Sequence, residues 1–390
     1  MVPTQRNGLE RGGRAPDVAV IGGGIIGALV ALRLAQRGAS VTVIDRGIPG
    51  GEASSAAAGI LGPQMEAHAP GPLLDLALVS RALYPKLAAE LRDATGIDVG
   101  FDRSGVLAVA LDERGEVDLE ERHRWQVERG LSVERLSGVE ARFREPALGP
   151  AVRAALEFPD DARVDAGALT RACIRAAAQV GVRFVAGRQV RRVAVEDGVA
   201  TGVELDADRL AAGAVVVAAG SWAGSLEGTG LPATAVRPVR GQIVSLAFLP
   251  AMLRRVVAVR GRGYVVPRLD GTVIAGSTME HVGFDKATTV DGIARILSLA
   301  SALVTWFGEA RVTGIWSGLR PDTEDHLPLL GESASVRGLF LATGHFRSGI
   351  LLAPITGDAI AELIATGRST MNLAPFSVDR LATTIGSSGA

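Results

Sequence analysis

The stretch Ile21-Gly22-Gly23-Gly24-Ile25-Ile26-Gly27 decides the fold, because it places three glycines at the G-x-G-x-x-G spacing. The apolar run Asp17–Ile21 leads into it and predicts a short buried strand. Gly27–Arg37 predicts a helix that ends at Gly38, and Val41–Ile44 predicts a second strand. Strand, helix and strand in this order form a βαβ unit, which requires a parallel sheet.

Each glycine of the stretch has a separate physical role. Gly22 permits the tight turn, Gly24 lets the backbone approach a pyrophosphate, and Gly27 allows the helix to pack closely on the strand. The N-terminal N–H groups of the helix then face the anion. Asp45 lies 21 positions after Gly24, at the end of the second strand, where its carboxylate can accept hydrogen bonds from ribose hydroxyls. The unit therefore predicts a bound dinucleotide, NAD or FAD, over the alternative of a glycine-rich structural turn.

Composition narrows the class of protein. The 390 residues are 47% hydrophobic and carry a formal net charge of −1, which gives neither the basic excess of a nucleic-acid-binding protein nor an acidic tail. Cys173 is the single cysteine, so an intrachain disulfide and a multi-thiolate metal site are excluded. The five histidines are widely scattered, and no metal site is expected. We expect a small-molecule partner and a reducing, cytoplasmic location.

The apolar stretch Val18–Ala35 follows three arginines and so resembles a signal peptide. We reject that interpretation because the stretch contains four glycines and Arg33, and because a strand follows it directly. Residues 1–16 are expected to be a disordered leader, and no membrane span is predicted. The helix-like stretch Leu73–Leu91 has Leu76, Val79, Leu83 and Leu87 at helical spacing, which favours core packing over attachment to a membrane surface.

The middle of the chain continues the α/β pattern. Leu169–Val180 predicts a helix with Cys173 on its apolar face, and Asp197-Gly198 predicts the turn of a hairpin. The β-branched run Val215–Val217 predicts a central strand.

A different architecture follows. Tyr264–Arg268 and Val273–Gly276 predict an antiparallel hairpin, with a helix at Ile293–Val304. Leu339–Ala342 then predicts a strand and Ile355–Ile364 an apolar helix, which restores the α/β pattern.

The expected fold class is α/β plus α+β, with a Rossmann-like FAD-binding domain into which a β-rich antiparallel substrate domain is inserted. The expected divisions are a leader at 1–16, the dinucleotide domain at 17–95, 150–232 and 325–370, the inserted domain at 96–149 and 233–324, and a C-terminal tail at 371–390.

Two further segments favour FAD over NAD. Glu52–Gly59 is rich in small residues, as needed where backbone passes close to a bulky planar group, although a tightly packed loop has the same composition. Thr343–Gly349 is a second junction of strand, loop and helix, whose helix N-terminus can stabilise negative charge on a reduced ring.

Several separate motifs in the same order resemble the D-amino-acid oxidase family of FAD-dependent oxidoreductases, from about Asp17 to Leu363. They are Gly22–Gly27 with Asp45, Ala53–Gly59, Val236–Gln242, Tyr264–Arg268, Gly276–Glu280, Gly318–Pro321 and Ala342–Gly349. The resemblance implies noncovalent FAD, a two-domain fold and oxidation of a small amine such as glycine, sarcosine or a D-amino acid. Molecular oxygen is the implied electron acceptor.

The resemblance also carries residue roles. The implied cofactor contacts are Gly22, Gly24, Ile25, Ile26, Gly27, Asp45, Arg46, Ala53, Ser54, Ala58, Gly59, Ile60, Val190, Gly220, His345, Phe346, Arg347, Ser348, Gly349, Ile350 and Leu351. Arg320 and Tyr264 resemble the pair that holds the substrate carboxylate, and a guanidinium matches a carboxylate bidentately. Arg347 is implied near the flavin or the substrate. The implied pocket-lining residues are Met279, Arg262 and Ile60; for Arg262, a simply solvated side chain is the alternative.

The implied reaction transfers a hydride from the α-carbon to flavin N5, which depends on position and needs no side-chain base. The product imine would hydrolyse to an oxo acid, and reoxidation of the flavin would give hydrogen peroxide. Two alternatives stay open: a flavin-dependent D-amino-acid dehydrogenase that uses a quinone or another acceptor, and a non-enzymatic flavin-binding subunit. A role in thiamine biosynthesis, a role in secondary metabolism and assembly into a homo-oligomer also stay open.

Overall fold

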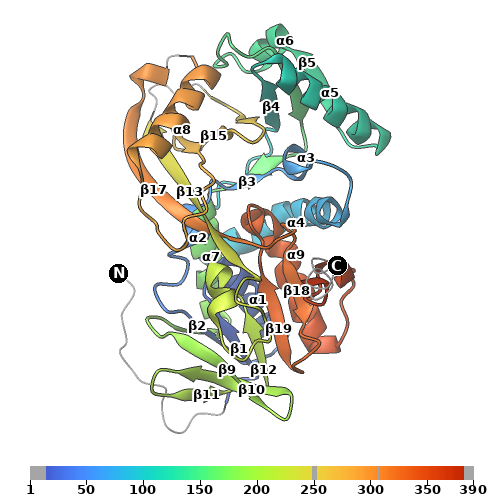
Figure 1. The fold of residues 1–390 in the computed structure, drawn as a ribbon, viewed down its shortest axis with the longest axis vertical. Helices are drawn as coiled ribbons and strands as arrows, with labels where there is room; N and C mark the ends of the chain where they lie inside the picture. Colours follow the sequence, from blue (N-terminus) through green and yellow to red (C-terminus); the bar gives the residue numbers. More distant parts are fainter. Residues whose placement is uncertain (1–14, 248–252, 306, 382–390) are drawn as a thin grey trace, which may run out of the picture.

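The computed structural model describes residues 15–247, 253–305 and 307–381 (Figure 1). Residues 1–14, most of the expected leader, and residues 382–390 of the expected tail lie outside this range. Two large sheets organise the described residues: a six-stranded sheet in the lower half of Figure 1 and an eight-stranded sheet above it.

The six-stranded sheet has the order β18-β19-β12-β1-β2-β8. Its strands come from distant parts of the chain: β1 (Val18–Ile21), β2 (Val41–Ile44), β8 (Arg183–Val185), β12 (Ala214–Val217), β18 (Leu329–Glu332) and β19 (Leu339–Thr343). All neighbours pair in parallel except β18 with β19. The predicted βαβ unit is therefore confirmed. β12 lies between β1 and β19, so the predicted central strand is also confirmed.

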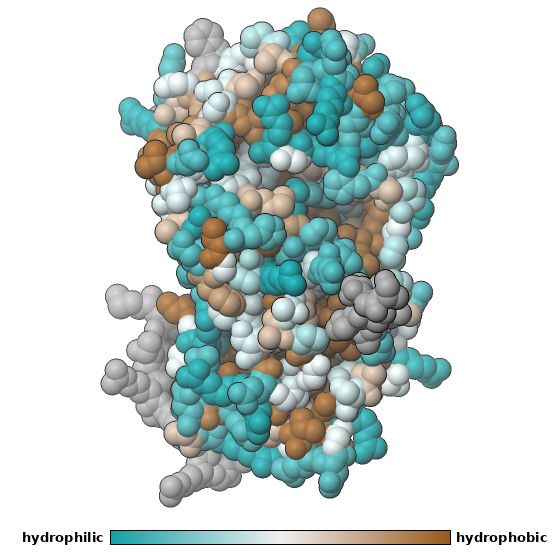
Figure 2. Space-filling model, in the orientation of Figure 1, coloured by the Kyte–Doolittle hydropathy of each residue, from teal (hydrophilic) through white to brown (hydrophobic). Residues whose placement is uncertain are grey.

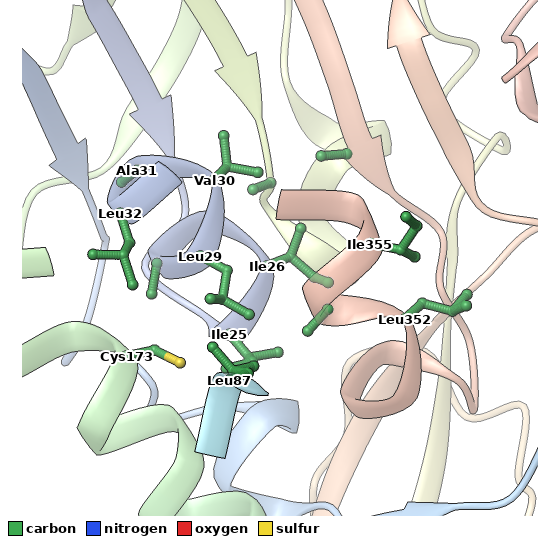
Figure 3. Packing of buried hydrophobic residues seen from close by; sticks show 14 of the residues in the cluster. Ile25, Ile26, Leu29, Val30, Ala31, Leu32, Leu87, Cys173, Leu352 and Ile355 are labelled. Atoms are coloured by element: carbon green, nitrogen blue, oxygen red, sulfur yellow. The ribbon is translucent and has the colours of Figure 1, made fainter. Parts of the chain in front are cut away.

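Four helices cover this sheet. They are α1 (Ile25–Gln36), α4 (Pro72–Thr95), α7 (Ala166–Gln179) and α9 (Gly349–Thr366). Figure 3 shows α1 packed between neighbours, with Leu29 between Cys173 of α7 and Ile355 of α9. Cys173 has no exposed surface, as predicted for a core residue. Within the predicted apolar face of α4, Val79 is 41% exposed, and Ser80 and Tyr84 are buried instead. The helix is rotated so that these hydroxyls reach backbone carbonyls of α9.

The eight-stranded sheet has the order β17-β13-β16-β15-β14-β4-β6-β5. Its strands are β4 (Val106–Ala110), β5 (Glu134–Ser137), β6 (Ala154–Phe158), β13 (Arg237–Ala247), β14 (Val256–Val259), β15 (Gly263–Pro267), β16 (Thr272–Gly276) and β17 (Arg311–Asp322). β15 and β16 form the predicted hairpin. The packing helices are α5 (Glu113–Glu128), α6 (Gly138–Arg144) and α8 (Val290–Leu303). The expected boundary at 150 lies too early, because β6 pairs with β4 and β5 in this sheet.

Smaller elements complete the fold, and a separate three-stranded sheet lies at the lower end of Figure 1. The hairpin predicted around Asp197-Gly198 is β9 (Val190–Glu196) with β10 (Val199–Leu205), and β11 (Arg209–Ala211) extends it to three strands. The remaining elements are α2 (Ala53–Ala56), β3 (Ile60–Leu61), α3 (Pro63–Glu66), β7 (Ala162–Arg163), η1 (Gly220–Ser225), η2 (Phe307–Glu309) and η3 (Ala374–Phe376).

The apolar character of the chain is mostly internal. Within the described part of the chain, α9 alone is long and apolar enough to cross a membrane, and 61% of its length is buried in the fold. A core helix of this kind meets the same criteria of length and hydropathy. Figure 2 shows hydrophobic residues scattered among hydrophilic ones on the visible face.

Candidate active site

One long cavity lies between the two sheets and extends along the ends of β1, β2, β12 and β19. It encloses about 2110 Å³ of space between protein atoms, including the part that is open to solvent. β13, β15 and β17 of the eight-stranded sheet supply its other wall. This position, beyond the carboxyl ends of parallel strands, is where open α/β sheets bind ligands.

The glycine turn forms one end of the cavity. Gly22 has φ +103°, and a β-carbon there would lie 2.4 Å from the carbonyl oxygen of Ala218. Gly24 lines the cavity as the residue before α1, and the Ile25 amide donates to Ser54 Oγ at 3.0 Å. Gly27 does not line the cavity; its β-carbon would lie 2.0 Å from the Gly22 carbonyl oxygen. Its role is therefore the close packing of α1, and the implied cofactor contact is corrected.

Asp45 lies at the end of β2 with its carboxylate at the cavity. Oδ2 accepts from the Gly23 amide and Oδ1 from the Gly47 amide, each at 2.8 Å. Each carboxylate oxygen can accept a second hydrogen bond, so the side chain is fixed and still able to bind a pair of hydroxyls. This arrangement fits the ribose of a dinucleotide.

Small residues line the middle of the cavity. Gly59 has φ +80°, and a β-carbon there would lie 2.0 Å from the Val164 carbonyl oxygen. Ala53, Ser54, Ala58 and Ile60 line the same region. The backbone can therefore approach a planar group closely, as the fit of a flavin requires.

The C-terminal junction closes the opposite wall. The lining residues here are those implied by the resemblance, His345, Phe346, Arg347, Ser348, Gly349, Ile350 and Leu351, and the implied contacts Val190 and Gly220 line the cavity too. The first turn of α9 presents backbone N–H groups that have no partner within the helix. His345 is buried, contacts Thr356 Oγ1 through Nε2 at 3.0 Å, and burial lowers its pKa to about 3. The imidazole is therefore neutral at physiological pH.

Arg320 projects from β17 into the cavity. Its Nη2 donates to Ser277 Oγ at 2.6 Å and its Nη1 to the Thr278 carbonyl oxygen at 3.1 Å. Burial lowers the pKa of Arg320 from its ordinary value, an effect that the nearby Tyr264 opposes. Both of these partners are neutral oxygens, so an anionic ligand can supply the negative charge that pairs with the guanidinium.

Two glycines make room for the implied carboxylate-binding pair. A β-carbon on Gly241 of β13 would lie 2.2 Å from Arg320 Nη2, and one on Gly276 would lie 2.9 Å from the Tyr264 hydroxyl oxygen. Tyr264 is paired with Gly276 across β15 and β16. The two side chains thus line the same part of the cavity because their neighbouring strands carry no side chain at these positions.

Arg347 is held by a residue that sequence reasoning missed. Its Nη2 lies 2.9 Å from Glu66 Oε1, at the end of α3, and both residues line the cavity. The two side chains are 30% and 27% exposed, so this ion pair lies where the cavity meets solvent.

Arg46, an implied cofactor contact, also packs against an aromatic ring and pairs with a carboxylate. Its guanidinium carbon lies 3.5 Å above the centre of the Trp222 ring, and Nη2 lies 3.1 Å from Glu52 Oε1. Arg46, Glu52 and Trp222 all line the cavity, which places a cation–π pair at the rim of the site.

Two implied pocket residues lie elsewhere and are corrected. Met279 is 50% exposed and does not line the cavity. Arg262 lies in the turn between β14 and β15, where its side chain is 53% exposed and 3.6 Å from Asp112. That turn directs Arg262 outward, so the solvated alternative is the observed one.

Several residues at the cavity were not expected from the sequence. They are Glu66, Trp222, Gly241 and Ser277. Gly241 and Ser277 belong to the recognised motifs Val236–Gln242 and Gly276–Glu280, which were a usable signal. Glu66 and Trp222 belong to none of these motifs.

Comparisons with known proteins identify relatives of this chain. A family model described as "DAO: FAD dependent oxidoreductase" matches residues 17–363. The glycine oxidase of Geobacillus kaustophilus is 38% identical over 93% of this chain and 97% of the relative. Its crystal structure gives a TM-score of 0.89 over 93% of this chain and 98% of that one.

Two other relatives differ in their names. The bifunctional protein ThiO/ThiG of a Synechocystis species is 37% identical over 94% of this chain but only 54% of the relative. The crystal structure of iminodiacetate oxidase from a Chelativorans species has a TM-score of 0.83 and 29% identity, over 92% of this chain and 98% of that one.

Proposed function

This chain belongs to the DAO family of FAD-dependent oxidoreductases, and from that membership we propose that it deaminates a small amino acid oxidatively. It is an FAD-dependent enzyme that oxidises amines or amino acids. The proposed substrates are glycine, sarcosine or a small D-amino acid, with molecular oxygen as the electron acceptor. The name oxidase on two relatives supports oxygen.

The observation that carries the proposal is the half-buried Arg320 guanidinium at the cavity, which donates to two neutral oxygens. A planar guanidinium binds a carboxylate through two parallel hydrogen bonds. Tyr264, on the adjacent part of the wall, supplies a hydroxyl to the same anion. An amino acid bound in this way has its carboxylate fixed, which leaves its α-carbon directed along the cavity.

The proposed cofactor-binding residues are the glycine turn, Asp45, the loop Ala53–Ile60 and the N-terminus of α9. FAD, when bound, supplies the acceptor for the two electrons and the hydrogen that leave the α-carbon. The chain's own contribution is orientation and exclusion of water, because His345 has a pKa of about 3 and the Arg320 guanidinium already carries its proton.

The proposed division of the chain follows the two sheets. We assign residues 17–95, 159–232 and 325–370 to the FAD-binding part and 96–158 and 233–324 to the substrate part, a division supported by the membership of β6 in the eight-stranded sheet. We also propose a cytoplasmic location, supported by the single buried cysteine. A role in thiamine biosynthesis is a further proposal, supported by the similarity to ThiO/ThiG.

The test is oxidation of glycine, sarcosine and D-alanine by the purified FAD-loaded protein. We expect anaerobic bleaching of the flavin by at least one of them, and hydrogen peroxide in air. Bleaching without peroxide would assign the alternative of a dehydrogenase. If no amine bleaches the flavin, the chain is a flavin-binding subunit and the proposed function is wrong.

A further inference from the structure

A polar cluster lies on the side of the β13–β17 strand pair opposite to the cavity. Gly241 and Ile243 of β13 line the cavity, whereas Arg240 and Gln242 alternate with them and point to the other face. Arg240 and Gln242 are 4% and 0% exposed. A β-carbon on Gly292 of α8 would lie 2.4 Å from Gln242 Nε2, so α8 covers this side.

Glu280 is the acceptor at the centre of the cluster. Arg240 Nε donates to Glu280 Oε2 at 2.5 Å, and Gln242 Nε2 donates to both carboxylate oxygens at 3.0 and 3.1 Å. Burial raises the pKa of Glu280, but the hydrogen bonds from Gln242 and Arg240 outweigh it and hold the pKa below its ordinary value. Asp285 adds an outer partner, because its Oδ2 accepts from Arg240 Nη1 at 2.7 Å.

The cluster fixes the turn that holds Arg320. Backbone hydrogen bonds of 2.9 and 3.0 Å pair Arg240 with Glu280, and the Gln242 amide donates to Thr278 Oγ1 at 2.9 Å. The turn Ser277–Glu280 is therefore attached to β13 at Thr278 and at Glu280. Its Ser277 Oγ and Thr278 carbonyl oxygen are the two acceptors of the Arg320 guanidinium.

We propose that Glu280, together with Arg240 and Gln242, is a positioning residue for substrate binding, because it fixes the Ser277–Glu280 turn that orients the Arg320 guanidinium. The inference rests on the proposed role of Arg320 as the carboxylate anchor. Glu280 itself does not line the cavity. Its effect on the substrate passes through two steps, from the carboxylate to the turn and from the turn to the guanidinium.

The test compares Glu280→Gln with a matched control, Glu90→Gln. Glu90 Oε1 also accepts from one arginine and one glutamine, Arg33 Nη1 at 2.5 Å and Gln36 Nε2 at 2.8 Å, but it lies on α4 and does not line the cavity. Both variants remove one negative charge from an equivalent pair of donors. A purely structural effect lowers the Tm of both and leaves ligand binding unchanged.

The main readout is the dissociation constant of acetate, measured from the change it causes in the visible absorption of the bound flavin. We expect Glu280→Gln to raise this constant and the KM of the amine substrate about five- to tenfold, the size that coupling between neighbouring groups produces, with kcat within about twofold. Glu90→Gln should match the parent protein in both. Asp285→Asn removes only the half-exposed outer partner and should give a smaller change in the same direction, in a variant that folds readily.

Failure of the inference and failure of the proposed function are distinguishable. If acetate binds to the parent protein and neither Glu280→Gln nor Asp285→Asn weakens it, the positioning role is wrong and the carboxylate anchor stands. If acetate does not perturb the flavin of the parent protein at all, the anchor is wrong and the inference falls with it.

Discussion

The guanidinium of Arg320 lies directly over the α-carbon of Gly241 on the neighbouring strand, where a β-carbon would be 2.2 Å from Nη2 and 2.5 Å from the guanidinium carbon. Because Gly241 carries no side chain, the Arg320 guanidinium, the proposed carboxylate anchor, can pack directly against the backbone of β13. The geometry of the anchor depends on this glycine as much as on the arginine.

Gly241→Ala should displace the guanidinium and weaken substrate binding. Because overpacking costs about 1–3 kcal/mol, we expect KM to rise about 5- to 150-fold, with FAD content unchanged. Steady-state kinetics and the flavin-to-protein ratio measure both. The control is Gly71→Ala, at an extended glycine whose β-carbon would meet nothing within 4 Å; it should match the parent. An unchanged KM in Gly241→Ala would contradict the proposed position of the anchor.

Tyr264→Phe should remove one hydrogen bond to the substrate carboxylate and keep the ring packed on Gly276. Hydrogen bonds to charged groups contribute about 1.5–3 kcal/mol, so we expect KM to rise about 10- to 150-fold. Thermal unfolding of the variant should stay close to that of the parent. A lower Tm with an unchanged KM would instead assign the hydroxyl to stability alone.

Glu66→Gln should alter the response to substrates with a second carboxylate. The variant weakens the ion pair with Arg347 at the opening of the cavity and leaves that guanidinium available to an anionic group. Because partly exposed ion pairs contribute at most about 1 kcal/mol, the ratio of kcat/KM for iminodiacetate to that for sarcosine should rise about two- to fivefold. In Arg347→Gln the ratio should not rise. Equal ratios in parent and Glu66→Gln would rule out this role for Arg347.

His345→Gln should make the free energy of unfolding less dependent on pH below pH 6.5. Burial lowers the pKa of the folded-state imidazole to about 3 from its ordinary 6.5, so below pH 6.5 the unfolded chain takes up a proton that the folded chain does not. The stability that neutral His345 contributes is fully present above pH 6.5. It decreases by about 1.4 kcal/mol per pH unit as the pH falls from 6.5 to about 3.

Urea unfolding of the FAD-loaded parent and His345→Gln at pH 7 and pH 5 measures this difference. Glutamine can still bond Thr356 but takes up no proton in this range. Burial of Asp161 raises its pKa to about 6 and gives a contribution of opposite sign, which is common to both proteins. Equal losses of stability in the two proteins between these pH values would show that the imidazole already titrates when folded.

The sequence predicted four strands of the six-stranded sheet, β1, β2, β12 and β19, because they are short and mostly apolar. The edge strands β8 and β18 were not predicted, because a charged residue lies in each. Val41–Ile44 has the predicted bounds, and the two predicted hairpins are present. The start of α9 was missed by six residues, because Pro354 indicates a helix boundary in the sequence, whereas tertiary packing continues the helix through it.

Most implied cofactor contacts in the recognised motifs line the cavity, but Met279 of the motif Gly276–Glu280 is half-exposed and does not. Arg262 precedes Tyr264 by two positions, which suggests a shared face of a strand, but the turn before β15 directs it to solvent. Glu66 reaches Arg347 across 281 positions of sequence, a contact that local patterns do not encode.

The order of the six-stranded sheet bears on how the protein is made. β1 and β2 leave the ribosome first, yet β19 and α9, which complete the binding wall, come more than 290 residues later in the chain. At a synthesis rate of about 5–20 residues per second, roughly 15–60 seconds separate the synthesis of the glycine turn from that of β19 and α9. Until α9 is synthesised, the face of α1 that packs against it has no native partner, and the C-terminal wall of the proposed FAD site is missing.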